Sequence, residues 1–240
     1  NTGINSDTAI VTLADDGDNN NDSSYTTNTL NVATVLSLPQ TEDVEGTTPV
    51  FNYSEKIAGD RMLWLTKTNR YGNGNMTPDS ITPRAPGVRY FLFDSYSRIT
   101  SSAGTVSLLY SNCIEMPASN ATTTYSTRMK FWMTHDTLFS GGSNMRPDSI
   151  YVVVSTDKGM TWNRVAGFAR IDLSLTLNTW KQHEVLLTSF NNGQNIQIGF
   201  EGVSYNGNVI GLDDIEIKVC QSSPISISYS GPFCSSISTP

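Results

Sequence analysis

Apolar and polar residues alternate along most of the chain from about residue 49 onward, and this period of two predicts β-strands. In the run 128–133, for example, Met129, Phe131 and Met133 share one face, whereas Trp132 lies on the other face with two basic residues. Such a strand has one side in a core and the other side in water. No segment of a dozen residues keeps a 3.6-residue apolar period, so no helix is predicted.

The predicted strands are short and are bounded by Gly, Asn, Pro or Ser, as expected for strands joined by turns. One run, Ile150–Val154, is continuously apolar, which is typical of a central strand covered on both faces. Many short antiparallel strands predict an all-β fold, an antiparallel β-sandwich of the jelly-roll type. The predicted strands are Met62–Thr66, Val88–Phe93, Thr105–Tyr110, Thr127–Met133, Ser149–Ser155, Trp162–Gly167, His183–Thr188, Asn195–Glu201 and Val209–Val219.

The chain divides into three parts by pattern. Residues 1–38 hold two β-prone runs around an Asp/Asn-rich loop and are too short to bury a core, so they are expected to be the end of a preceding β module or a linker hairpin. Residues 39–220 form the sandwich, with 39–48 as a junction at its start. Residues 221–240 are expected to be a linker or the start of a following module. The chain is therefore expected to be one piece of a longer protein.

Composition and charge exclude several classes of protein. Of 240 residues only 15% are charged, and Ser, Thr and Asn are abundant, as in secreted β proteins. The net charge is −7, and eight of the 22 acidic residues lie in residues 1–50, which contain no Lys or Arg. Nucleic-acid binding is not expected because no basic patch offsets phosphate charge. No apolar run approaches 18 residues, so membrane insertion is not expected either.

The segment Ser155–Trp162 predicts a tight hairpin, in which Asp157 caps the turn, Gly159 takes a positive φ and Trp162 anchors the return strand. The same pattern recurs several times in sialidase propellers. Here it occurs once, without the arginine cluster that would hold a carboxylate, so a sialidase is not expected.

No catalytic motif stands out. His135 and His183 lack a Gly-x-Ser-x-Gly elbow, and Cys113 lacks the surroundings of a cysteine protease nucleophile. A carboxylate pair suited to glycosidic cleavage depends on distances in space that a sequence does not give. Asp213 and Asp214 are adjacent in a predicted strand, so their side chains point to opposite faces. We therefore expect a protein that is not an enzyme.

Exposed aromatic residues are the candidates for ligand binding. Trp132, Tyr71 and Tyr205 are suited to stacking on sugar rings, and both tyrosines are followed by Gly and Asn residues of flexible loops. Loops of any sandwich have a similar composition. The other tryptophans, which are expected to fill the core, are Trp64, Trp162 and Trp180.

The three cysteines, Cys113, Cys220 and Cys234, fit no metal-binding spacing, and their odd number leaves at least one unpaired within the chain. A disulfide between Cys220 and Cys234 would close a short loop. The alternative is three reduced thiols, mostly buried.

Several motifs follow one another in a recognisable order from residue 42 to residue 220. They begin with the acidic segment Glu42–Gly46 and continue through Met129–Met133 and the Ser155–Trp162 hairpin. The most specific are Gly-Phe-Glu-Gly at 199–202 and Leu-Asp-Asp-Ile at 212–215. This order resembles the MAM-like adhesion domains, above all the cleaved-adhesin (choice-of-anchor type) jelly rolls of Bacteroidetes surface proteins. Animal members usually have a Cys within the segment matching 129–133, so its absence here favours the bacterial branch.

The resemblance implies a concanavalin A-like jelly roll that acts as a non-catalytic adhesion or binding module, secreted by the type IX system to the bacterial cell surface. Its partners would be a surface glycan, a protein receptor or neighbouring modules. It further implies a structural Ca²⁺ near the sandwich edge, with ligands from the acidic segment and the aspartate pair: Asp43, Glu45, Asp94 and Asp214. The alternatives are a carbohydrate-binding ancillary domain of a secreted protease or glycosidase, and a structural repeat in a surface stalk or filament.

Overall fold

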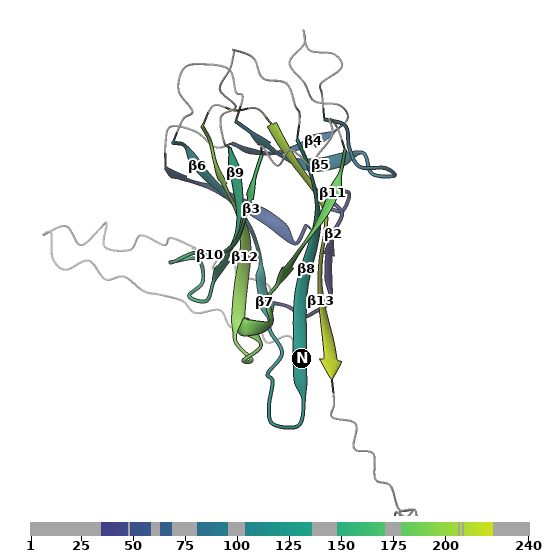
Figure 1. Cartoon of the computed structure of the whole chain (residues 1–240), viewed down its shortest axis with the longest axis vertical. Coiled ribbons are helices and arrows are strands. Elements are labelled where there is room, and N and C mark those ends of the chain that lie inside the picture. The colour runs from purple at the N-terminus through teal and green to yellow at the C-terminus, as the bar shows by residue number, and fades with distance from the viewer. Residues whose placement is uncertain are drawn as a thin grey trace, which may run out of the picture. The chain divides into compact units, whose positions relative to one another are not determined.

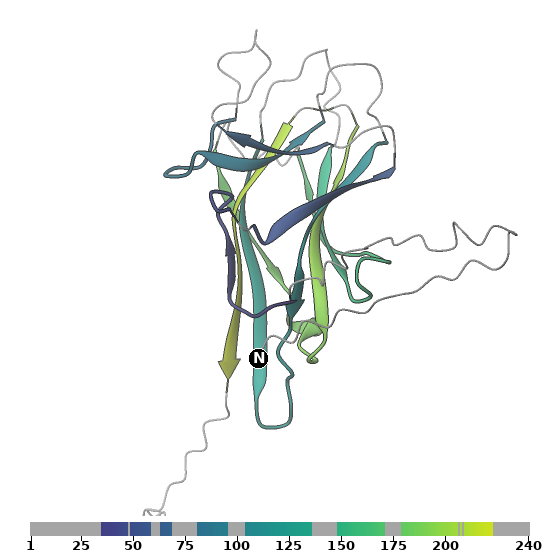
Figure 2. The ribbon, with the colours of Figure 1, turned by 180° about the vertical axis from the view of Figure 1, so that it is seen from behind.

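The computed structural model of the chain describes residues 35–47, 49–58, 63–68, 81–95, 104–135, 148–170, 179–205, 207 and 209–222. These residues form two β-sheets packed face to face, together with a single short 3₁₀ turn, Thr188–Phe190 (Figure 1). Figure 2 shows the same two layers from behind. The fold is therefore the all-β sandwich predicted from the alternation. No helix among the described residues is long and apolar enough to cross a membrane.

The first sheet has seven strands and is centred on β12, which pairs antiparallel with β9 on one side and with β6 and β7 on the other. Strand β10 extends the sheet beyond β9, and β3 extends it beyond β6. Strand β1 pairs with β7 and is parallel to it. The strands are β1 (Val35–Leu36), β3 (Phe51–Ala58), β6 (Val106–Ser111), β7 (Cys113–Glu115), β9 (Ser149–Ser155), β10 (Asn163–Ala169) and β12 (Asn195–Val203).

The second sheet has six strands in the order β11-β8-β13-β5-β4, with β2 also paired to β13. Strand β13 pairs with β5 over its first four residues and with β2 at Ile215–Ile217, while β8 pairs along most of its length. The strands are β2 (Gln40–Glu42), β4 (Trp64–Thr68), β5 (Arg89–Asp94), β8 (Thr124–His135), β11 (Lys181–Leu186) and β13 (Val209–Ser222).

The main core lies between the two sheets, where alternate residues of each strand point inward. On β8, Met129, Phe131 and Met133 are fully buried, as the alternation predicted. The ring of Phe131 meets the rings of Phe168 and Phe200 edge-on at centroid distances of 5.3 and 5.1 Å. Aromatic contacts of this geometry add to the stabilisation from burial alone. The core therefore joins the two sheets through rings from three strands.

A smaller apolar cluster covers part of the outer face of the six-stranded sheet. Ile81 packs there on Tyr90, Leu92 and Val209, with Trp180 beside them. The indole N–H of Trp180 donates to the carbonyl of Thr82 at 3.1 Å. The start of segment 81–88 is therefore anchored against this sheet.

Most predicted strands are present in the structure, but three observed strands, β2, β3 and β7, were not predicted. Strands β3 and β7 escaped prediction because β3 is interrupted by charged residues and two bulges, and β7 has only three residues. Residues 39–48, predicted as a junction, instead contribute β2 to the sheet, where Glu42 is paired with Ile215. The predicted strand His183–Thr188 ends at Leu186 and continues as the 3₁₀ turn.

The predicted division of the chain remains a prediction, because nearly all of 1–38 and 221–240 lies outside the described residues. At the borders, Val35–Leu36 is paired within the seven-stranded sheet, and β13 extends to Ser222.

Candidate ligand-binding surface

Trp132 lies on the outer face of the six-stranded sheet. The alternation of β8 that buries Phe131 and Met133 turns Trp132 outward, between Gln182 of β11 and Asp213 of β13. Its indole ring is half-buried, so part of it is accessible. Trp132 is therefore outward-facing, as the sequence predicted.

Strand β13 is irregular beside Trp132. Asp213 is opposite Trp132, but the next paired residue, Glu216, is opposite Lys130, so β13 has one residue more than β8 in this interval. Asp214 has a φ of 43°, in the left-handed region that few non-glycine residues adopt. A β-bulge of this kind re-aims a side chain, and such bulges are frequent next to binding sites. The bulge thus breaks the simple rule that neighbouring strand residues point to opposite faces.

Arg84 contacts both Trp132 on β8 and Asp214 on β13. Its guanidinium lies 4.1 Å from the centre of the Trp132 ring and forms an ion pair with the Asp214 carboxylate. The side chains of Arg84 and Asp214 are 27% and 35% exposed. We call Arg84, Trp132, Asp213 and Asp214 the Arg84 surface. One face of the Trp132 ring is therefore covered by Arg84, which corrects the expectation of a bare aromatic platform.

The backbone that carries Arg84 is fixed on both sides. On one side, Trp180 binds the carbonyl of Thr82. On the other side, Glu45 accepts hydrogen bonds from the N–H groups of Val88 and Arg89, each at 2.6 Å. The guanidinium is thus held in position before any ligand arrives, which reduces the entropy lost on binding.

Asp213 has an unusual environment for a carboxyl group. It is 2% exposed, and burial raises its pKa to about 7. The neighbouring Asp214 charge also raises this pKa, whereas hydrogen bonds from the backbone N–H groups of Asp214 and Arg84 and the Arg84 charge lower it. Near neutral pH this group is therefore partly protonated and can act as a donor or an acceptor. Strongly perturbed groups of this kind cluster at functional sites.

The predicted calcium ligands are only partly brought together. Because Glu42 is paired with Ile215, the start of the acidic segment lies beside the Asp213–Asp214 pair. However, the Glu45 carboxylate accepts backbone N–H groups, and Asp214 is paired with Arg84. In the part of the chain that the structure describes, no three His, Cys, Asp or Glu side chains gather into a possible metal site.

Ca²⁺ requires several oxygen ligands, and these two carboxylates already face hydrogen-bond donors. In this structure Glu45 and Asp214 are therefore held by different partners. Asp94 is buried at the end of β5, in register with Val209, and Asp43 accepts the N–H of Glu45 at 3.0 Å. The calcium ion stays a prediction of the sequence.

The other predicted site residues lie elsewhere. Tyr205 is exposed in the β12–β13 connection, where its N–H donates to the buried Asp148 carboxylate at 2.7 Å. Tyr71 lies outside the described residues. Cys220 is exposed on β13 and Cys113 is buried, while Cys234 also lies outside the described residues. The predicted disulfide therefore stays a prediction.

The sequence analysis missed Arg84 and misplaced Trp162. Pro83 directly precedes Arg84, and Pro86 follows it two positions later. Proline restricts the backbone, and this restriction was the only feature of the sequence that distinguished Arg84. Trp162, expected in the core, packs instead against Tyr110, on the outer face of the seven-stranded sheet, with ring centroids 5.4 Å apart. Trp64, by contrast, is in the core as predicted.

The outer face of the seven-stranded sheet also carries an arginine on an aromatic ring. Arg164 lies 3.8 Å from the ring centre of Tyr151 and is paired with Glu201 at 2.5 Å. Strand β10 also has a register shift beside Arg164, but none of the described residues next to it has a positive φ. This trio is therefore a matched comparison for the Arg84 surface.

Comparison with known proteins gives structural likenesses only. No family model matches the chain, and no curated protein matches it. The K2 cleaved adhesin domain of Lys-gingipain is 16% identical, with a TM-score of 0.49 over 75% of this chain and 99% of that one. The K3 domain of Lys-gingipain from Porphyromonas gingivalis is 14% identical, with a TM-score of 0.42 over 75% and 97%. TmCBM61, solved with β-1,4-galactotriose, is 17% identical, with a TM-score of 0.40 over 70% and 88%.

Proposed function

We propose that this chain is a non-catalytic extracellular binding module that recognises a glycan through the Arg84 surface. The observation that carries the proposal is the guanidinium of Arg84, which lies over the Trp132 ring and is paired with Asp214 beside the buried Asp213. Fixed donors and acceptors on a sheet face, next to an aromatic ring, suit a ligand that is rich in hydroxyl groups.

The residues have distinct roles in this proposal. Arg84 has five N–H donors in a planar fork, and Asp214 supplies acceptor oxygens, so together they match two neighbouring hydroxyl groups of a sugar. Trp132 supports the guanidinium from beneath and offers the accessible part of its ring to the C–H groups of the sugar. Asp213 sets the charge of the surface through its protonation.

The proposed biological role is adhesion by a module of a longer, secreted cell-surface protein. A carbohydrate-binding ancillary domain of a secreted hydrolase would use the same surface in the same way. Nothing in the roles above requires a nucleophile or a general base. In keeping with this, the ring of His183 is packed against Phe131 and Phe168 at 5.5 and 4.7 Å.

The test is a glycan array probed with the full chain, followed by calorimetric titration of the best ligand with three variants. We expect Arg84→Gln and Arg84→Lys each to weaken binding by roughly tenfold, because both lose the fork that hydroxyl groups would bind. The matched control is Arg164→Gln, which removes an arginine that likewise lies over an aromatic ring and pairs with a carboxylate, on the other sheet. Its affinity is expected to equal that of the wild type.

Circular dichroism of each variant confirms that the fold is kept. Two results would contradict the proposal: an array on which no glycan binds, or an Arg84→Gln variant that binds as tightly as the wild type.

A further inference from the structure

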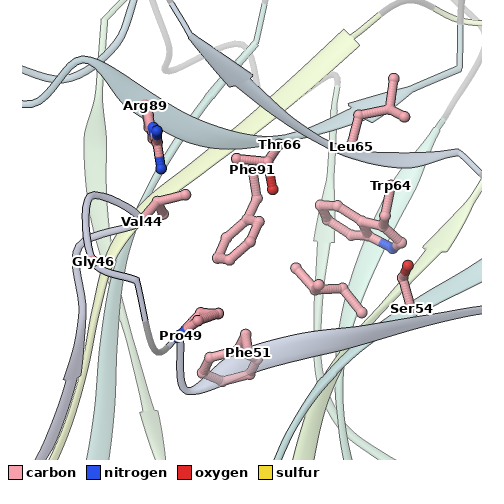
Figure 3. A pocket seen from close by; sticks show the side chains of 11 residues that line it. Val44, Gly46, Pro49, Phe51, Ser54, Trp64, Leu65, Thr66, Arg89 and Phe91 are labelled. Carbon is pink, nitrogen blue, oxygen red and sulfur yellow. The ribbon is translucent and has the colours of Figure 1, made fainter.

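The sandwich has an open side where the two sheets end. Strand β3 is the last strand of the seven-stranded sheet and β4 the last of the six-stranded sheet, and among the described residues each pairs with one strand only. A cavity of about 260 Å³ opens between these edges. In Figure 3, Trp64 and Phe91 point from one side toward Phe51 on the other. We call this cavity the edge pocket.

The floor of the edge pocket is apolar and rigid. Phe51, Trp64, Phe91 and Leu109 line it, and each is at least 95% buried. The indole N–H of Trp64 donates to the carbonyl of Ser107 at 3.0 Å, so the ring is fixed and presents no unsatisfied polar atom. Such a floor favours an aromatic or branched aliphatic group.

One end of the edge pocket is closed by the loop between β2 and β3. The Glu42 carboxylate, 3% exposed, accepts the N–H groups of Val44, Val50 and Phe51. Val44 is thereby held in a conformation with a φ of 61° and lines the pocket. The hydrogen bonds to Glu42 therefore fix the conformation of the loop, and the pocket is formed in the absence of a ligand.

The mouth of the edge pocket carries one exposed arginine, Arg89. Arg89 lines the mouth and is exposed, and its guanidinium has no hydrogen-bond or ion-pair partner among the described residues. The nearby Glu45 carboxylate bonds to backbone N–H groups of Val88 and Arg89. Thr66 and Ser54 complete a polar rim. Because Glu45 is engaged by the backbone, the exposed Arg89 guanidinium can pair with a carboxylate of a ligand.

We propose that the edge pocket binds an extended acidic peptide, which adds as a strand to the edge of β4 opposite β5, inserts an aromatic side chain into the pocket and places a carboxylate against Arg89. Among the described residues, the outer edges of β3 and β4 pair with no further strand, so their backbone groups can pair with an extended peptide. Thr66 faces the pocket and Arg89 is opposite Thr68, two residues further along β4. Since side chains two residues apart on a strand share a face, the peptide motif is aromatic-x-acidic or its reverse.

The probe is a fluorescein-labelled heptapeptide, Thr-Thr-Phe-Thr-Glu-Thr-Thr, titrated with the full chain and followed by fluorescence anisotropy. We expect binding that weakens roughly tenfold with Arg89→Gln, which removes the charge, and with Thr66→Phe, which fills the pocket from its exposed rim. The control Lys158→Gln removes an exposed charge from the Asp157 turn and is expected to leave binding unchanged. Peptides with Ala for Phe or Gln for Glu are expected to bind more weakly.

A second measurement reports on the pocket itself. The chain has four tryptophans, so a ¹⁵N–¹H spectrum shows four indole N–H signals, assigned by single Trp→Phe variants. The peptide should shift the Trp64 signal, whereas a glycan at the Arg84 surface should shift the Trp132 signal. Failure of one proposal is therefore visible independently of the other.

Three outcomes would overturn the inference: no anisotropy change at millimolar protein, binding insensitive to both Arg89→Gln and Thr66→Phe, or a peptide that shifts the Trp132 signal and not that of Trp64. If 3-phenylpropionate binds as tightly as the peptide, the strand pairing is refuted, because the small acid lacks a backbone to pair with β4.

Discussion

The replacement of Gly202 by alanine tests the packing between the two sheets. Gly202 lies on β12, and a Cβ atom there would come within 2.2, 2.4 and 2.7 Å of three ring carbons of Phe93. Carbon atoms in contact normally lie about 3.5–4.0 Å apart, so the ring would have to retreat by more than about 1 Å. Phe93 is fully buried and its ring lies 5.3 Å from that of Trp64, which leaves it little room.

We therefore expect Gly202→Ala to lower the free energy of unfolding by about 2–3 kcal/mol, within the range for overpacked cores. For a domain of this size that corresponds to a fall in melting temperature of roughly 4–12 °C. Urea denaturation followed by circular dichroism measures the change, provided that the m-value stays constant.

The matched control is Gly167→Ala, whose Cβ would come within 2.9 Å of the Tyr151 ring. That ring is half-buried on an outer sheet face and can move, so the expected loss is below about 1 kcal/mol. Adding Phe93→Leu should recover part of the loss in Gly202→Ala, because a smaller side chain removes the clash. The reasoning fails if both glycine variants lose the same stability, or if Phe93→Leu and Gly202→Ala are simply additive.

Two further predictions concern the Arg84 surface. Because burial raises the pKa of Asp213 to about 7 in the folded state, above its value in the unfolded chain, this group stabilises the fold below about pH 4, and its contribution is lost as pH rises to about 7. Asp213→Asn should therefore gain stability relative to the wild type between pH 4.5 and 8, by up to a few kcal/mol in urea titrations, and a pH-independent difference would argue against a raised pKa. The calcium ion predicted from the sequence requires a higher melting midpoint in CaCl₂ than in EDTA, and this difference should shrink in Asp43→Asn; equal midpoints would count against a bound ion.

The sequence predicted individual strands well where one face of a strand is buried. Over residues 128–133 of β8 the apolar residues of the alternation are the buried ones, because a strand between two sheet neighbours has two fixed faces. Prediction failed for β2 and β3. Strand β2 pairs with β13 and β3 pairs with β6, and these partners lie far away in the sequence. The carboxylate of Glu42 illustrates the reason: an acidic residue in a Pro- and Gly-bounded segment reads as exposed, yet it is buried as the acceptor for a whole loop.

The candidate site was predicted in part, for a similar reason. Trp132 and Asp214 were both selected from the sequence, but for two different sites, a sugar platform and a calcium centre. A bulge in β13 and the distant segment that carries Arg84 bring them to one place. Sequence spacing gives no indication of a contact between residues 84 and 214, which are 130 positions apart.

By itself, the sequence determined the fold class, the outward position of Trp132 and the inward position of its neighbours, because these follow from local alternation between polar and apolar side chains. Only the tertiary structure decided which charges meet, since those contacts depend on strand register and on one extra residue in β13. The edge pocket was likewise decided by the tertiary structure. It lies between two edge strands of different sheets that do not pair with each other, and the local sequence pattern of either strand does not predict this arrangement.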